Sequence, residues 1–254
     1  MPIPRYRHAQ GLRPIDLRAN DAANRQPPDT SFHYGGGQWQ LAGGIAEVVS
    51  GKSWAELVKQ TYVDLCDTAS LGYTNQFVKA SQGGGVGAAL DYPSFFQGDV
   101  GSLPTTGNPS VEGGLYATAS DYGEILLMHL RGGQCAGGRV LSEGAVARMR
   151  ADRILDKYNG STAGMTGRVT GAGGLDGYGM GWWIDRVHAG VFADPGLYGA
   201  FPWLDLTRGY AAAIVLEANG GDVGAELWSI AKPAVDQAFA EPANADETVC
   251  EKVY

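Results

Sequence analysis

The chain has 254 residues, with 27 acidic and 19 basic side chains, so its formal charge is −8 and its isoelectric point is near 4.9. Hydrophobic residues make up 44% of the chain, enough to bury a core, and this excludes a disordered acidic tail. The sequence has no Lys/Arg cluster and no apolar run of about 18 residues, so we expect neither nucleic-acid binding nor a membrane span. One large domain is favoured, because no linker interrupts the chain.

The three cysteines are widely spaced and odd in number: Cys66, Cys135 and Cys250. There is no CxxC motif and no Cys/His cluster, so the sequence predicts no zinc site, and no cofactor is expected. Buried free thiols are the favoured interpretation, and one disulfide plus a free cysteine is the alternative. The N-terminus lacks the apolar core of a secretory signal, so the localisation is left open. A periplasmic or secreted location would require an upstream segment.

The first 70 residues predict two helices after an irregular lead-in at residues 1–30. The first is a short amphipathic helix after Tyr34, which Gly51 ends. Its helically spaced apolar residues are Leu41, Ile45, Val48 and Val49. Ser53 and Glu56 form a capping-box pattern that begins the second helix. Its expected buried stripe is Leu57, Tyr62 and Leu65.

The middle of the chain is a long segment rich in glycine, proline and aromatic residues, from Gly72 to Gly114, and such segments often border sites. A third helix is expected to begin between Thr118 and Asp121 and to end at Gly132-Gly133. Ser142 is the expected cap of a fourth, short helix.

The last third of the chain predicts an antiparallel meander followed by a helix. Three strands are expected, at residues 179–184, 200–206 and 210–217. We expect the second strand to pair with the third through a turn at residues 207–209. The final helix is expected at 223–240, with Pro233 disturbing its middle. Helices followed by a meander indicate the α+β class.

Four segments carry motifs whose order along the chain is informative. They are Phe32–Gly43 with Tyr34-Gly35-Gly36, Glu112–Asp121 with Gly113-Gly114-Leu115, Gly179–Trp182, and Asp194–Asp205 with Asp194-Pro195-Gly196. Together they resemble the Tyr-x-Asn, GGL, YGLGW and Lys-Thr-Gly elements of the serine β-lactamase-like hydrolases, which include class C β-lactamases, DD-peptidases and related esterases. The resemblance implies a β-lactamase/transpeptidase-like fold, an antiparallel sheet flanked by helices. Residues 31–254 would form its larger, C-terminal part, incomplete at the N-terminus.

In this family, the serine of a Ser-x-x-Lys turn is the nucleophile, a tyrosine relays the proton, and two backbone N–H groups hold the oxyanion. The resemblance implies that Tyr34 is the catalytic tyrosine and that the N–H of Leu197 is the oxyanion donor from the edge strand. It places the substrate beside Gly36, Gly196, Tyr198 and Gly199.

Three departures from the family pattern shape the functional expectation. Gly36 replaces the Asn, and Asp194-Pro195 replaces the Lys-Thr, so the groups that bind β-lactams are missing and an esterase or amidase is favoured. The family's Ser-x-x-Lys precedes the tyrosine, yet residues 1–33 contain no lysine. The chain's one Ser-x-x-Lys, Ser229–Lys232, lies on the final helix, where Pro233 follows it. We do not expect Ser229 to be the nucleophile.

Several side chains also have a plain structural interpretation. Tyr34 could be a core or rim aromatic. Trp182, Trp183 and Trp203 are expected to pack in the core rather than form a substrate cage. His129 is expected to be structural and His188 to be exposed. The expected caps or turn residues are Glu112, Asp121 and Asp205.

The sequence thus predicts a serine hydrolase-like domain for ester or amide hydrolysis, inactive alone because its nucleophile is absent. Whether it is an enzyme stays open, and we favour part of one. The expected partners are a small acyl substrate and a complementary N-terminal segment or chain. The alternative is a non-catalytic, truncated homologue that acts as a ligand-binding module, and an unrelated globular protein is the third, least favoured interpretation.

Overall fold

The computed structural model describes Phe32, Tyr34, Val111 and the ranges 37–73, 113–154, 175–196, 199–216 and 222–240. The lead-in at 1–30, most of the glycine-rich segment, Glu112 and Cys250 lie outside the described residues.

Two helical runs follow Tyr34. The first is α1 (Gly37–Ser50), and the second joins α2 (Trp54–Val58), the π-helical turn η3 (Lys59–Val63) and α3 (Asp64–Cys66). The capping box is confirmed: Glu56 N–H donates to Ser53 Oγ at 3.3 Å, and Ser53 N–H donates to the Glu56 carboxylate at 2.8 Å. These bonds satisfy backbone donors that the first turn of a helix leaves without partners.

The apolar stripe of α1 faces outward. The exposed fractions of Leu41, Ile45 and Val48 are 49%, 55% and 57%, whereas Gln40 and Glu47 are buried. The polar face lies inward because it binds backbone groups of the adjoining loops. Gln40 Oε1 accepts the Val111 N–H at 2.9 Å, and Glu47 Oε1 accepts the Trp54 N–H at 2.6 Å.

The helices of the middle region begin at the predicted caps. Thr118 Oγ1 accepts the Asp121 N–H at the start of α6 (Ala119–Leu130), and Ser142 Oγ accepts the Ala145 N–H at the start of α7 (Glu143–Arg150). The chain leaves α6 through Gly132 and Gly133, whose φ angles are 64° and 94°, in the region that favours glycine. Before α6, β1 (Gly72–Tyr73) pairs with β2 (Leu115–Tyr116), so the two ends of the glycine-rich segment meet.

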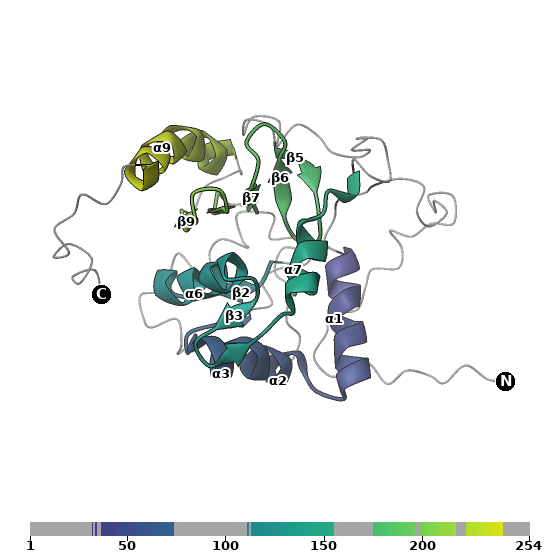
Figure 1. The fold of residues 1–254 in the computed structure, drawn as a ribbon. Coiled ribbons are helices and arrows are strands. Elements are labelled where there is room, and N and C mark those ends of the chain that lie inside the picture. Colours follow the sequence, from purple (N-terminus) through teal and green to yellow (C-terminus); the bar gives the residue numbers. More distant parts are fainter. Residues whose placement is uncertain are drawn as a thin grey trace, which may run out of the picture.

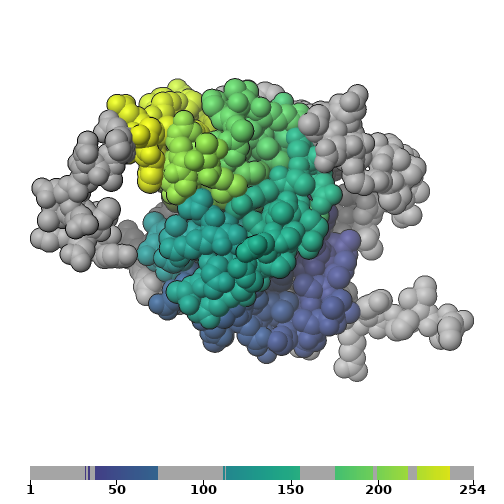
Figure 2. Space-filling model, in the orientation of Figure 1, coloured from purple at the N-terminus to yellow at the C-terminus, as the bar shows by residue number. Residues whose placement is uncertain are grey.

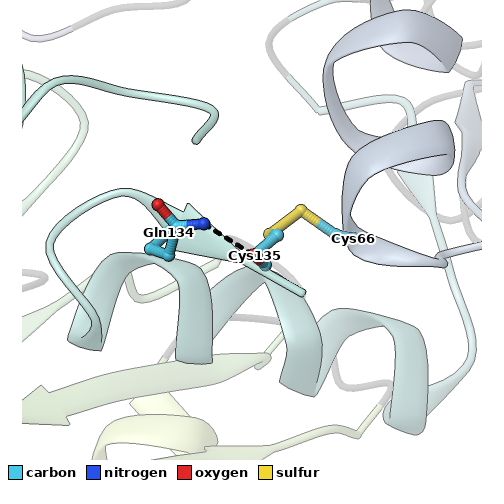
Figure 3. The surroundings of a disulfide bond; sticks show 3 residues. All are labelled: Cys66, Gln134 and Cys135. Carbon is cyan, nitrogen blue, oxygen red and sulfur yellow. Dashed lines mark hydrogen bonds between the residues drawn. A yellow bond between two sulfur atoms is a disulfide. The ribbon is translucent and has the colours of Figure 1, made fainter. Parts of the chain in front are cut away.

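A disulfide joins α3 to the hairpin of β3 (Gln134–Cys135) and β4 (Gly138–Arg139) (Figure 3). Its cysteines are Cys66 and Cys135, so the free-thiol interpretation is wrong for this pair, and the alternative with one disulfide holds. Two-residue strands carry no sequence pattern, so the hairpin that brings Cys135 to Cys66 was not predicted. The contact is close: the Gly137 N–H donates to the Leu65 carbonyl at 2.8 Å.

The main sheet is a five-stranded antiparallel meander in the order β5-β6-β7-β8-β9. Its strands are β5 (Leu175–Tyr178), β6 (Trp183–Asp185), β7 (Val191–Ala193), β8 (Phe201–Asp205) and β9 (Tyr210–Ile214). The predicted β8–β9 hairpin is confirmed, with Asp205 opposite Tyr210. The strand predicted at 179–184 begins too early, because Gly179–Trp182 is the turn between β5 and β6 and only Trp183 and Ile184 belong to β6. Strands β5 and β7 are too short for a clear periodicity.

The sheet lies between two helices, α6 on one face and α9 (Asp222–Ala240) on the other (Figure 1). Alternation along β8 explains this, since Phe201 and Trp203 pack with Trp228 of α9, and Leu204 packs with Leu126 of α6. Helix α9 continues through Pro233. In Figure 2, the teal surface of α6 and α7 separates the purple and blue N-terminal helices from the green and yellow sheet region.

The structural interpretations of single residues are confirmed. Trp182, Trp183 and Trp203 are 5%, 1% and 2% exposed, as expected of core residues. His129 is buried in α6, and burial together with the Arg150 charge lowers its pKa to about 4. The side chain of His188 is 58% exposed and contacts Asp185 at 2.8 Å.

Candidate functional site

Tyr34 lies at the end of the main sheet. Its ring centroid is 5.7 Å from that of Tyr178, the last residue of β5, and 5.3 Å from that of Trp183, the first residue of β6. Trp183 is opposite Ala193, the last residue of β7, in the sheet register. Tyr34 and the segment that follows β7, which lie about 160 residues apart in the sequence, are therefore brought to the same end of the sheet.

The turn that carries Tyr178 is held against α7. The Met180 N–H donates to the Met149 carbonyl at 2.8 Å, and the Gly179 N–H donates to the Trp182 carbonyl at 2.9 Å. A Cβ at Gly179 would lie 1.9 Å from the Met149 carbonyl oxygen, so glycine is required for this approach. This contact fixes Tyr178 and, through it, the wall on which Tyr34 packs.

The loop between β7 and β8 contains Gly196 and Gly199, two of the predicted substrate-binding residues. The Gly196 N–H donates to the Ala200 carbonyl at 2.7 Å, and the Gly199 N–H donates to the Gly196 carbonyl at 3.1 Å. Both amides are thus used within the loop, and their contribution to a site is the shape of the backbone. Helix α9 supports the loop closely, because a Cβ at Gly224 would lie 2.1 Å from the Gly199 carbonyl oxygen.

The other predicted site residues, Leu197, Tyr198 and Gly36, lie outside the described residues. Strand β7, which precedes this segment in the sequence, lies between β6 and β8 in the described sheet.

Asp194, directly after β7, is the most perturbed acid among the described residues. Burial raises its pKa from 3.8 to about 7, although its side chain is reached by solvent. Burial is the main cause of the raised pKa of Tyr122 on α6, and the charge of Asp194 adds to it. The pKa of Tyr178 is raised first by burial, then by Tyr34 and then by Asp194.

In the sequence, Asp194 stands out only as a departure from the family's lysine, and it was not among the predicted site residues. The sequence signal that could have placed Asp194 in the site was an acidic residue at a position where relatives have a cation. Tyr122 and Tyr178 carried no such signal, because their approach to Asp194 depends on how α6 and β5 pack.

The one Ser-x-x-Lys of the chain does not form a serine–lysine pair. Ser229 Oγ donates to the Glu226 carbonyl at 2.7 Å on the exposed side of α9. The Lys232 side chain is 7% exposed, and its Nζ lies 2.8 Å from Asp236 and 3.3 Å from Asp205. The lysine is therefore committed to two carboxylates. Its i, i+4 spacing to Asp236 was the sequence signal for that pair.

Asp205 has the turn role expected of it, whereas Asp121 caps no helix and instead binds Ser70, because Thr118 is the cap of α6. Asp205 accepts the Arg208 N–H at 2.8 Å, and Asp121 accepts the Ser70 N–H at 2.7 Å. Across the described ranges, no three His, Cys, Asp or Glu side chains are grouped to hold a metal ion. None of the helices in those ranges has the length and apolar character needed to cross a membrane.

The molecule has a five-stranded antiparallel sheet with a helix on each face, and aromatic and loop residues lie together at one end of the sheet. This architecture places it among β-lactamase/transpeptidase-like proteins. The Beta-lactamase family model matches residues 7–235, and the chain belongs to this family. Comparison with curated protein sequences gives no match.

Solved structures share this fold at low sequence identity. A candidate beta-lactamase from Bacteroides dorei has a TM-score of 0.60 at 21% identity, with 95% of this chain and 68% of that one covered. Simvastatin synthase from Aspergillus terreus has a TM-score of 0.57 at 12% identity, covering 92% and 68%. A penicillin-binding protein from Bacillus halodurans has a TM-score of 0.52 at 19% identity, covering 89% and 66%. The chain thus spans about two thirds of each, and the shared feature is the fold.

Proposed function

We propose that this chain forms the substrate-binding part of a serine hydrolase for esters or amides, and that alone it does not form an acyl-enzyme. The family and the fold support a serine hydrolase-like function. The observation that carries the finer proposal is the separation of Ser229 from Lys232, since Lys232 is held by Asp205 and Asp236.

The chemistry explains why this separation matters. A serine hydroxyl is a poor nucleophile until a neighbouring base takes its proton. A tyrosine can serve as that base only where a cation favours its phenolate, because an unperturbed tyrosine has a pKa of about 10. Asp194 follows β7 at the same end of the sheet, and its charge helps to raise the pKa of Tyr178, the residue against which Tyr34 packs. The first lysine of the chain is Lys52, which follows Tyr34 in the sequence.

In this proposal, Tyr34 relays the proton and the Leu197 N–H holds the oxyanion once a complementary N-terminal segment or chain supplies the Ser-x-x-Lys. The substitutions at Gly36 and Asp194-Pro195 favour ester or amide substrates over β-lactams. The fold does not choose the substrate, since its neighbours carry names as different as penicillin-binding protein and simvastatin synthase.

The test is labelling with a fluorophosphonate probe, read by intact-protein mass spectrometry. We expect no mass shift from the purified chain under conditions that label a known serine esterase completely. The Ser229→Ala variant is the matched control. Stoichiometric labelling of the chain that disappears in Ser229→Ala would identify Ser229 as the nucleophile and overturn the proposal. Labelling that survives in the variant would overturn it as well, by revealing another active serine.

The second candidate, a ligand-binding module without catalysis, is favoured by the same commitment of Lys232 to Asp205 and Asp236. The DNA immediately upstream of the Met1 codon discriminates between the two. An in-frame Ser-x-x-Lys there would favour the hydrolase, and a genuine start site without one would favour the binding module.

A further inference from the structure

Tyr178, the last residue of β5, is in contact with four other aromatic side chains. Two of them, Phe32 and Tyr34, precede α1 in the sequence, Trp39 belongs to α1, and Trp183 begins β6. The ring centroids of Phe32, Tyr34 and Trp183 lie 5.3, 5.7 and 4.7 Å from that central ring. Tyr34 also contacts Trp183 directly, with the two centroids 5.3 Å apart. We call these five residues the aromatic wall.

The centre of the aromatic wall is held in place by hydrogen bonds as well as by ring contacts. Burial, the largest effect, raises the pKa of Tyr178, whereas hydrogen bonds from the Gly181 backbone and the Trp39 side chain lower it. The Trp39 indole has only an N–H to offer, so it donates to the Tyr178 hydroxyl oxygen. Because the pKa is raised overall, Tyr178 stays a neutral phenol. The rings are therefore positioned before a ligand arrives, which lowers the entropic cost of binding.

The aromatic wall is buried at its back and exposed at its front. Tyr178 and Trp183 are 7% and 1% exposed and belong to the core cluster of the sheet. Phe32 and Trp39 are half-buried, and Tyr34 is 42% exposed. Tyr34 thus combines a fixed aromatic support with an accessible ring. A further ring can pack on it in the way that Tyr34 itself packs on Tyr178, edge to face at 87°.

We propose that the aromatic wall binds the ring of an aryl-bearing ester or amide, with Tyr34 as the residue that contacts it. The inference rests on the proposed function, in which Tyr34 relays the proton, and deepens it by naming the substrate class. Because Tyr34 belongs both to the wall and to the proposed site, a ring packed on the wall would hold the ester or amide group close to that site. An aryl group gains ring–ring contact in addition to the burial of apolar surface, and a saturated ring of equal size gains only the burial.

The experiment compares three methyl esters: methyl phenylacetate, methyl cyclohexylacetate and methyl acetate. Their dissociation constants for the full chain are measured by ligand-observed NMR titration. The cyclohexyl ester has the larger apolar surface, so a merely hydrophobic patch would favour it over the phenyl ester. We expect the opposite order, with the phenyl ester bound about threefold more tightly than the cyclohexyl ester. It should bind about tenfold more tightly than methyl acetate.

Two variants locate the preference on the molecule. Tyr34→Leu keeps an apolar side chain but removes the exposed ring, and it should abolish the preference for the phenyl ester. The matched control is Phe239→Leu, because Phe239 of α9 is a 55% exposed ring that likewise packs on a tyrosine, Tyr210, at a centroid distance of 4.7 Å. This control should keep the threefold preference. Circular dichroism verifies that both variants are folded.

A photolabel tests the location without any substitution. Methyl 4-benzoylphenylacetate, which carries a photoreactive aryl ketone, is irradiated with the unaltered chain, and the labelled peptides are identified by mass spectrometry. We expect label on peptides that contain residues of the aromatic wall, and competition by excess methyl phenylacetate should remove it. Label confined to peptides without any wall residue would overturn the inference.

The binding measurements have equally definite contrary outcomes. Phenyl and cyclohexyl esters of equal affinity, tighter binding of the cyclohexyl ester, or a preference that persists in Tyr34→Leu would each overturn the inference. Loss of the preference in Phe239→Leu would do the same. The proposed function fails separately, through labelling of the chain by the fluorophosphonate, because neither the NMR titration nor the photolabel requires turnover.

Discussion

The sheet region, residues 175–240, and the helical region, residues 37–154, are stabilised in different ways. Six of the nine largest fully buried side chains belong to the sheet strands, among them Trp183, Phe201 and Leu204. The helical region instead has one helix, α1, with its apolar stripe exposed, and it contains capped helix starts and a disulfide. Figure 1 shows the two regions meeting along α6.

This difference shows that an apolar periodicity does not by itself identify a core. In β8 every residue is buried, because α6 and α9 cover both faces of the sheet. In α1 the polar residues Gln40 and Glu47 are buried instead, since they accept backbone N–H groups that would otherwise lack partners. Each region therefore responds to a different kind of substitution.

The largest effect is expected from the disulfide. Replacing Cys66 and Cys135 by alanine should lower the free energy of unfolding by about 2–4 kcal/mol, because the bridge closes a long loop in the unfolded chain. Hydrogen exchange should lose protection in α6 and α3 before it does in β8. The measurement is urea unfolding followed by exchange mass spectrometry, with Cys250→Ser as the control. An unchanged transition midpoint would show that the helical region does not depend on the bridge.

In the sheet region, we expect a comparable loss of stability when the buried ion pair of α9 is broken. Lys232→Met should lower the free energy of unfolding by about 2–3 kcal/mol, because Asp205 and Asp236 lose a common partner while buried or nearly so. The matched control is Lys59→Met, which breaks an exposed pair with Asp64 and should cost about 0.5 kcal/mol or less. Equal effects of the two substitutions would contradict the assigned difference in burial.

Asp194→Asn should stabilise the protein, in contrast to both changes above. The folded pKa of about 7 exceeds the reference value of 3.8, so the group contributes stability below pH 4 that is lost as the pH rises through 7. The gain from the substitution should be absent at pH 4 and about 1 kcal/mol at pH 8, well below the full shift because solvent reaches the side chain. Urea unfolding at both pH values measures it, and a loss of stability at pH 8 would refute it.

The smallest effect is expected on the exposed stripe of α1. Ile45→Ser should change the free energy of unfolding by about 0.5 kcal/mol or less, since the side chain is 55% exposed. Leu204→Ala, in the core of the sheet, should cost about 3 kcal/mol. Thermal unfolding of the two variants side by side sharpens the comparison. A cost above about 1.5 kcal/mol for Ile45→Ser would mean that the stripe is covered.

Features encoded within a few neighbouring residues were predictable. The caps at Ser53, Thr118 and Ser142 depend on a side chain and a backbone N–H three residues away, so the sequence shows both partners at once. The β8–β9 hairpin has its two apolar runs and its turn within a short stretch. The order of the family motifs likewise requires no knowledge of packing, and it led to the family that the chain belongs to.

The sequence by itself therefore determined the α+β class, the helix starts, the last hairpin and the family. Tertiary structure alone decided the disulfide, the outward stripe of α1, the commitment of Lys232 to Asp205, and the packing of Tyr34 on Tyr178 and Trp183. The physical reason is that most of these contacts join distant residues, with 27 positions between Asp205 and Lys232, 69 between Cys66 and Cys135, and 71 between Gln40 and Val111. Their partners are fixed by how α6, α7 and α9 pack on the sheet, and that packing depends on the summed burial of many side chains rather than on any local pattern.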